Sequence, residues 1–158
     1  MTPAINLANK SGIAHQVHEY QHDPASASYG LEAATKLGVP PQRVFKTLVV
    51  RLDDASLAVA VVPVATQLNM KLMARAAGAK KAGMADKADV ERATGYVLGG
   101  VSPLGQKKRL PTYIDTAATA QGTIFVSAGR RGLEIELSPQ DLKALTQGHF
   151  AELCPVGE

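Results

Sequence analysis

The segment GYVLGGVSPLGQKKR, residues 95–109, carries the densest set of residues suited to chemistry. Its four glycines and one proline permit positive φ angles and close backbone approach, which a cradle of amide groups around an anion or a carbonyl oxygen requires. Gly100 and Ser102 begin a nucleophile elbow, but Pro103 lacks the N–H that must donate to the oxyanion. A phosphate loop would need a lysine where Gln106 stands. The segment therefore argues against a serine hydrolase and against a nucleoside triphosphatase.

Lys46 interrupts FKTLVVRL, residues 45–52, an apolar run that is otherwise typical of a buried strand. A lysine is almost never fully buried unless it is paired. It can extend into solvent from the edge of a sheet, or it can point into a polar cavity. Both interpretations of Lys46 remain open on this pattern alone.

Other candidate nucleophiles and metal ligands are weaker. His15, His18 and His22 have a metal-ligand spacing for a helix, but the stretch has the pattern of a strand and a loop, where successive side chains point to opposite faces. His149 and Cys154 could form a thiol and base pair, yet a single cysteine near one end of the chain is more often incidental. We therefore expect no protein nucleophile, no metal and no cofactor.

Composition limits the class of protein. A chain of 158 residues suits one domain, and its single cysteine cannot form a disulfide within the chain. No apolar window approaches the roughly 20 residues of a membrane span, and no leader pattern opens the chain, so we expect a cytoplasmic protein. The net charge of +3 is modest, but basic residues cluster at 80–81, 107–109 and 130–131. These clusters either contact phosphates or are solvated loop faces.

Caps and turn residues predict the elements that must position these groups. Thr2 and Pro3 begin a helix that ends before Gly12, and Ser138 and Pro139 begin the last one. The other expected helices cover 31–37, 69–77 and 87–94. Strands are expected at 15–20, 44–52, 57–62, 123–127 and 133–137, with shorter ones near 81–84, 96–98 and 112–114. This alternation predicts one mixed α/β domain in which the strands at 44–52 and 57–62 are central.

Several segments together resemble the YbaK/EbsC family of aminoacyl-tRNA deacylases. They are TPAI at the start, Tyr20 before HDP, FKTLVV, KKAGMADK, TGYVLGGVSPLGQKKR and GRRGLEIEL. The resemblance runs from Thr2 to about Phe150, and it implies one YbaK-like domain over residues 1–158, with a mixed, partly barrel-like β-sheet surrounded by helices. The nearest branch of the family hydrolyses cysteine mischarged onto tRNA(Pro), and the editing domain inserted in prolyl-tRNA synthetase shares the fold.

The resemblance also implies roles for individual residues. Lys46 matches the family's essential lysine, which holds the phosphate and ribose end of the acceptor adenosine, and Gly99 matches the catalytic backbone position. The residues matching substrate-binding positions are Tyr20, Tyr29, Thr47, Gly100, Ser102, Pro103 and Glu134. Tyr29 stands where a phenylalanine is expected, and Glu134 stands where an aspartate is expected. The basic residues expected to contact tRNA phosphates are Lys107, Lys108, Arg109, Arg130 and Arg131.

The resemblance implies a reaction in which the substrate supplies its own nucleophile. The thiol of the cysteinyl ester attacks its own carbonyl, and the enzyme contributes position and charge stabilisation. Two alternatives stay open: a deacylase for another small amino acid such as alanine, and a non-catalytic module that binds tRNA or a synthetase. The expected partners are Cys-tRNA(Pro) and, in a complex, prolyl-tRNA synthetase.

Overall fold

The structure is a computed structural model that describes residues 1–26 and 29–155. Its strands form two sheets. The first has three strands in the order β1 (His15–Glu19), β7 (Leu133–Leu137), β6 (Ile124–Arg130). The second has five, in the order β4 (Ala82–Met84), β2 (Phe45–Leu52), β3 (Leu57–Pro63), β5 (Thr112–Asp115), β8 (His149–Ala151). A parallel bridge between Val44 and Phe125 joins the two sheets.

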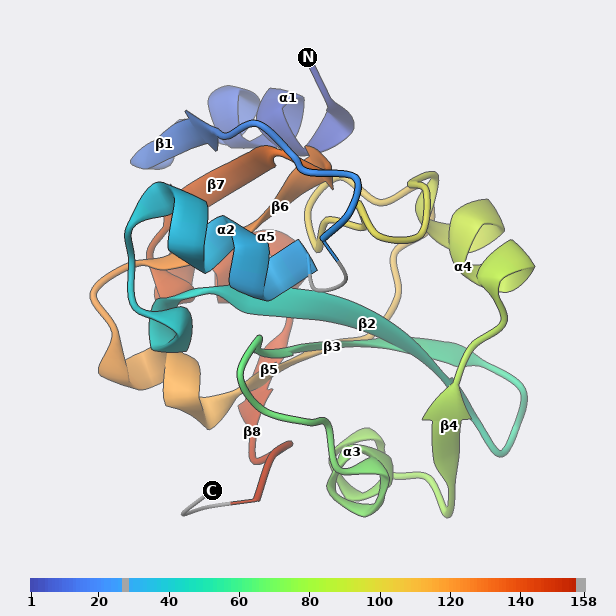
Figure 1. The fold of residues 1–158 in the computed structure, drawn as a ribbon. Coiled ribbons are helices and arrows are strands. Elements are labelled where there is room, and N and C mark those ends of the chain that lie inside the picture. The colour runs from blue at the N-terminus through green and yellow to red at the C-terminus, as the bar shows by residue number, and fades with distance from the viewer. Residues whose placement is uncertain (27–28, 156–158) are drawn as a thin grey trace.

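The helices lie around the sheets (Figure 1). They are α1 (Pro3–Ser11), α2 (Tyr29–Leu37), α3 (Met70–Ala77), α4 (Lys87–Thr94) and α5 (Pro139–Thr146), with short 3-10 turns η1 (Pro41–Arg43) and η2 (Thr116–Ala120). The expected caps of the first and last helices are present: the Thr2 hydroxyl accepts from Ile5 N at 3.2 Å, and the Ser138 hydroxyl accepts from Asp141 N at 3.1 Å. The prediction of one mixed α/β domain is confirmed.

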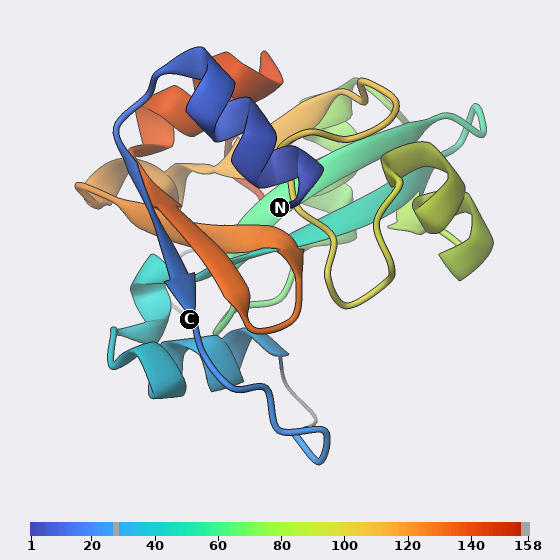
Figure 2. The ribbon, with the colours of Figure 1, turned by 90° about the horizontal axis from the view of Figure 1, so that it is seen from above.

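Strand β2 has different neighbours along its length. It pairs antiparallel with β3 from Phe45 to Arg51, whereas its register with β4 covers Val50 to Leu52. Viewed from above, the first half of β2 extends beneath the β6 and β7 hairpin (Figure 2). The first half of β2, which carries Lys46, therefore faces the three-stranded sheet and has no pairing with β4.

Alternating residues of β2 supply two separate parts of the core. Phe45 and Val49 pack with Val126 and Ile135 of the three-stranded sheet, whereas Val50 packs with residues under α3. Complete burial of a side chain of this size stabilises the fold by roughly 1.5 to 3 kcal/mol. Packing on both faces thus holds β2 in place, and this fixes the directions in which the polar side chains of the strand point.

Three features of the fold differ from the expectations. The segment 96–98 is not a strand; Tyr96 is buried, whereas Val97 and Leu98 are exposed. The short strand β8 was not predicted, and the strands divide into two sheets instead of one. Strands β2 and β3 both lie inside the five-stranded sheet as expected, although β4 pairs with β2 only over Val50 to Leu52 and β5 pairs with β3 only over Val59 to Val61. In the described part of the chain, no helix is long and apolar enough to cross a membrane.

Candidate active site

A cavity of about 360 Å³ lies where β2, the end of the β6 and β7 hairpin and the glycine-rich loop approach one another. Its polar or charged lining residues are Tyr20, Lys46, Thr47, Ser127, Arg130, Arg131 and Glu134. Its apolar and glycine lining residues are Gly30, Val44, Phe45, Leu48, Val64, Leu98, Gly99 and Val101. Apolar pockets with a few convergent polar groups are typical of ligand sites.

Lys46 and Thr47 enter this cavity from the first half of β2. The Lys46 amine donates to the Thr66 carbonyl oxygen at 2.9 Å, and the side chain is half-buried. The Thr47 hydroxyl is buried and has no hydrogen-bond partner among the described residues. An unmet buried hydroxyl costs about 1 to 3 kcal/mol, which a ligand with a polar atom can offset. Lys46 is therefore a cavity residue and not a solvated strand edge.

Glu134 reaches the same cavity from β7, the central strand of the other sheet. Only 7% of the residue is exposed, and this burial raises the pKa of its carboxyl group to about 8. Tyr20 lies nearby, and burial together with Glu134 raises the pKa of its phenol. At neutral pH the carboxyl group of Glu134 is thus mostly uncharged and can donate as well as accept a hydrogen bond.

The glycine-rich loop forms the opposite rim. Gly99 has φ 96°, a conformation that favours glycine, and it lines the cavity. The Tyr96 hydroxyl donates to Leu104 O at 2.5 Å and closes the loop on itself. Ser102 and Pro103 are buried and do not line the cavity; the Ser102 hydroxyl instead accepts from Leu104 N at 3.2 Å. The structure therefore brings Gly99 to the site, whereas Ser102 and Pro103 shape the loop behind it.

Gly100 also lies behind the rim. A Cβ atom at this position would come within 2.9 Å of Arg130 Cα, so the loop packs directly against the end of β6. This close approach holds Arg130 beside Gly99 at the cavity mouth. Gly100 is buried and is not among the lining residues.

The basic residues divide between two regions. Arg130 and Arg131 line the cavity, whereas Lys108 and Arg109 line a separate hollow of about 510 Å³. Arg51, from the far end of β2, lines the same hollow. None of the described residues forms an ion pair with Arg51, Lys108 or Arg109. Lys107 is exposed beside them.

The remaining sequence candidates lie elsewhere. The side chain of Tyr29 lies outside the described residues, although its backbone begins α2. His15 and His18 make separate hydrogen bonds, to Asn9 and Glu136. Within the described ranges, no three His, Cys, Asp or Glu side chains come together as metal ligands.

Cys154 is buried in the core cluster under α3, and its sulfur lies 3.3 Å from the Thr66 hydroxyl oxygen. Burial raises the pKa of this thiol, which lowers its nucleophilicity at neutral pH. It does not line the cavity, so its position does not favour a catalytic thiol.

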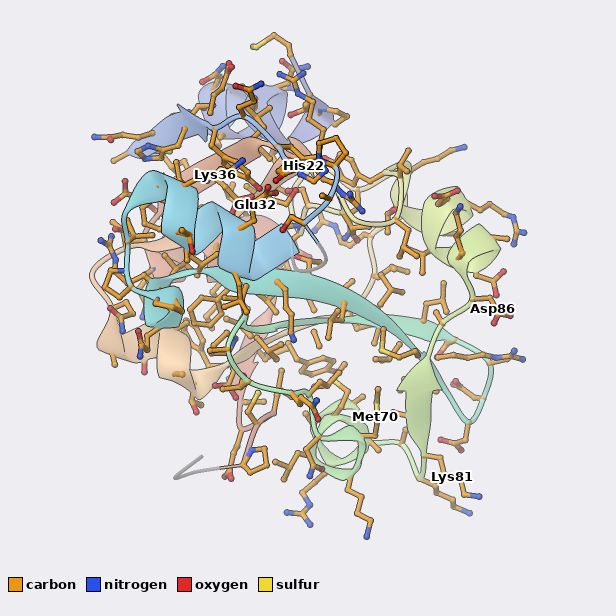
Figure 3. All side chains as sticks on the ribbon, in the orientation of Figure 1. His22, Glu32, Lys36, Met70, Lys81 and Asp86 are labelled. Atoms are coloured by element: carbon orange, nitrogen blue, oxygen red, sulfur yellow. The ribbon has the colours of Figure 1, made fainter. Side chains whose placement is uncertain are left out.

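Sequence reasoning missed several lining residues. Ser127 pairs with Glu134 in the ladder between β6 and β7, and Leu98 covers the rim with half of its surface exposed. A strand pattern at 123–127 could have indicated that Ser127 shares a sheet with Glu134, but not that both line a cavity with Lys46. His22 and Glu32, close together in Figure 3, were also missed as a pair.

Comparisons with known proteins find a matching family and several similar chains. The family described as aminoacyl-tRNA editing domain matches residues 23–145. EbsC of Enterococcus faecalis, described provisionally as a Cys-tRNA(Pro)/Cys-tRNA(Cys) deacylase, is 39% identical over 154 residues, covering 96% of this chain and 92% of EbsC. A solved structure described as a candidate trans-editing enzyme for prolyl-tRNA synthetase is 25% identical with a TM-score of 0.84, covering 97% of this chain and 95% of that one. A structure of a hypothetical protein, 24% identical with a TM-score of 0.86 over 97% of this chain and 99% of its own, shares the fold.

Proposed function

Because the chain belongs to the aminoacyl-tRNA editing domain family, we propose that it is a trans-editing deacylase that removes cysteine mischarged onto tRNA(Pro). The observation that carries the proposal is the convergence of Lys46, Thr47 and Glu134 in one cavity. These side chains offer an amine, a hydroxyl without a partner among the described residues and a mostly uncharged carboxyl group. The cavity of about 360 Å³ lies within the size range of ligand sites and can hold an amino acid esterified to the end of a nucleic acid.

The proposed reaction uses the thiol of the substrate as the nucleophile. The sulfur attacks the ester carbonyl carbon, a C–S bond forms, and the C–O bond to the ribose breaks. The thiol proton passes to the ribose oxygen, which leaves as a hydroxyl group, and the cysteine leaves as a small cyclic thioester that water later opens. The cavity lining includes neither cysteine nor histidine among the described residues, which agrees with a reaction that needs no protein thiol or imidazole.

The enzyme then contributes orientation and charge stabilisation. We propose that Lys46 holds the phosphate and ribose end of the acceptor adenosine, while the backbone at Gly99 faces the ester. Alignment of two reacting groups can lower a barrier by about 7 to 11 kcal/mol in favourable systems, and one oxyanion donor adds roughly 3 kcal/mol. These two effects account for catalysis without a covalent enzyme intermediate.

Charge supports a tRNA substrate. Arg130 and Arg131 flank the cavity, and the hollow lined by Arg51, Lys108 and Arg109 lies at the other end of β2. Arg51 lies five positions after Lys46 on β2, about 16 Å along the strand, so one RNA strand can extend from the first region to the second. Phosphate contacts of this kind position a nucleic acid without reading its sequence. We further propose prolyl-tRNA synthetase as a partner that supplies the mischarged tRNA.

A deacylation assay tests the proposal. Cysteinyl, alanyl and prolyl esters on tRNA(Pro) are compared with the wild-type protein and the Lys46→Ala variant. Preferential loss of the cysteinyl ester, with release of the cyclic thioester, supports the proposed reaction. Equal hydrolysis of the alanyl ester would show that the reaction requires no thiol on the substrate, and it would favour the alanine alternative. Tight tRNA binding without hydrolysis of any ester would favour a non-catalytic module.

A further inference from the structure

A hydrogen-bonded chain links helix α2 to the mouth of the cavity. Glu32 lies in the first turn of α2 and is buried, and its Oε1 lies 2.6 Å from His22 Nδ1. His22 Nε2 in turn lies 3.0 Å from Arg131 Nη1, and Arg131 lines the cavity. Figure 3 shows His22 and Glu32 side by side, although they come from a loop and a helix.

The chemistry of arginine fixes the direction of this chain. A guanidinium nitrogen can only donate, so Nε2 of His22 must accept from Arg131. The proton of the neutral imidazole is then on Nδ1, which donates to Glu32. The carboxylate thus orients the imidazole, and the imidazole orients the guanidinium.

Glu32 is suited to this role because it remains ionised. Burial acts to raise the pKa of its carboxyl group, but hydrogen bonds from His22, from the Asp23 backbone N–H and from Lys36 outweigh it and hold the pKa below the ordinary value. The Asp23 N–H donates to Glu32 Oε2 at 2.8 Å, and the Lys36 amine lies 3.3 Å from the same oxygen. Lys36 also donates to the Gln21 carbonyl oxygen.

The backbone brings Arg131 and His22 together independently of these side chains. Tyr20 N donates to Gly132 O at 2.9 Å. Gly132 has φ 87°, and a Cβ atom there would come within 2.7 Å of Tyr20 O, so the turn packs directly on the segment before His22. Since the bond from Tyr20 N to Gly132 O already anchors the loop, the contact between His22 and Arg131 is not needed for that anchoring.

We infer that His22 and Glu32 are positioning residues that hold the Arg131 guanidinium at the cavity mouth, where it receives a phosphate group of the RNA substrate. The inference rests on the proposed function. An arginine loses considerable rotamer freedom on binding, and a contact made beforehand removes part of that cost. A neutral imidazole orients the guanidinium without cancelling its charge. His22 and Glu32 therefore act on substrate binding and touch neither the ester nor the thiol.

The test separates KM from kcat for Cys-tRNA(Pro) hydrolysis in five variants. Arg131→Ala should raise KM by about 10- to 100-fold, as expected for removal of one charge-assisted hydrogen bond, with little change in kcat. His22→Leu and Glu32→Gln should raise KM in the same direction by a smaller factor. His22→Gln should keep KM near the wild-type value, because the amide oxygen of the glutamine side chain can accept the hydrogen bond that Nε2 of His22 accepts. Lys71→Ala, on the exposed face of α3, is the control for loss of one positive charge, and its KM should stay at the wild-type value.

A double variant distinguishes positioning from general stabilisation. When Arg131 is already alanine, His22→Leu should add no further increase in KM. An equal increase in both backgrounds, with a lower thermal unfolding midpoint, would show that His22 only anchors the loop and would overturn the inference. If the wild-type protein hydrolyses no cysteinyl ester, the proposed function fails; the same variants are then compared by titration with tRNA, where the same pattern in Kd decides the inference on its own.

Discussion

Lys46 and Glu134 reach one cavity from different sheets, the lysine from β2 and the carboxyl group from β7. They form no ion pair; the Lys46 amine donates to Thr66 O, and Glu134 has its pKa raised to about 8 by burial. The cavity therefore presents an ammonium group and a mostly uncharged carboxyl group to a ligand at neutral pH. This difference yields separate expectations for the two residues.

Replacement of Lys46 by alanine should reduce activity much more than stability. Removal of the hydrogen bond to Thr66 O costs about 0.5 to 1.5 kcal/mol of unfolding free energy, whereas removal of a charge-assisted bond to the substrate and misplacement of the ester should lower kcat/KM by at least about 100-fold. Lys46→Arg should restore little activity, because a planar guanidinium does not fit the space of a compact ammonium group. Hydrolysis of Cys-tRNA(Pro) and thermal unfolding are measured on the same preparations, with Lys71→Ala as a surface control. Near wild-type turnover by Lys46→Ala would remove the lysine from the mechanism.

The raised pKa of Glu134 predicts a dependence of stability on pH. Below the ordinary pKa of 4.5 the carboxyl group is protonated in both states, so this group contributes no pH dependence there. As the pH rises from 4.5 to about 8 the unfolded chain ionises and the folded one does not, so the free energy of unfolding falls by up to about 1.4 kcal/mol per pH unit. Glu134→Gln should abolish this fall and be the more stable protein near pH 8. Denaturant unfolding of both proteins across this range gives the difference; parallel curves would contradict the buried, protonated carboxyl group.

Replacement of Cys154 by alanine should preserve turnover. The thiol is buried beside Thr66 and does not line the cavity, and the proposed attacking sulfur belongs to the substrate. Loss of the buried sulfur atom should lower the unfolding free energy by about 1 kcal/mol. The measurement is kcat for Cys-tRNA(Pro) at a temperature where both proteins are folded. A folded but inactive Cys154→Ala protein would refute the substrate-assisted mechanism.

The separate basic hollow should contribute to tRNA affinity by charge alone. Combined replacement of Arg51, Lys108 and Arg109 by alanine should weaken binding and reduce the slope of log K against log salt concentration by about 0.7 to 0.9 for each phosphate that the variant no longer neutralises. Hydrolysis of a short aminoacylated acceptor fragment that reaches only the cavity should be unaffected. Lys10→Ala with Lys71→Ala, on the exposed faces of α1 and α3, provides the control. An unchanged slope in the triple variant would mean that these residues are solvated surface charges.

Local signals in the sequence predicted most of the fold. The Thr2 and Pro3 cap, the apolar run at 45–52 and the cap at Ser138 each depend on neighbours within a few residues, and each element formed as expected. The strand expected at 96–98 did not form, because Tyr96 is buried whereas both Val97 and Leu98 are exposed, on an irregular loop held by the hydrogen bond from Tyr96 to Leu104. A strand pattern cannot distinguish that arrangement from a sheet.

The site was only partly predictable from the sequence, because part of it depends on contacts between residues far apart in the chain. Family resemblance identified Lys46, Gly99 and Glu134, and all three line one cavity. The contact between His22 and Arg131 joins residues 109 positions apart, and the pairing of β1 with β7 in the three-stranded sheet is similarly distant in sequence. Such contacts are fixed by tertiary packing, for which a single sequence carries no periodic signal.

The bridge between Val44 and Phe125 has a consequence for the degradation of the protein itself. The cavity lies between the two sheets that this bridge joins. A molecule that fills the cavity therefore contacts both sheets and stabilises their association. By mass action, a ligand at a hundred times its Kd adds about 2.7 kcal/mol to the free energy of unfolding. The tRNA on which the enzyme is proposed to act thus also stabilises the native state of the enzyme. The resistance of the enzyme to proteolysis should therefore rise with the supply of mischarged tRNA.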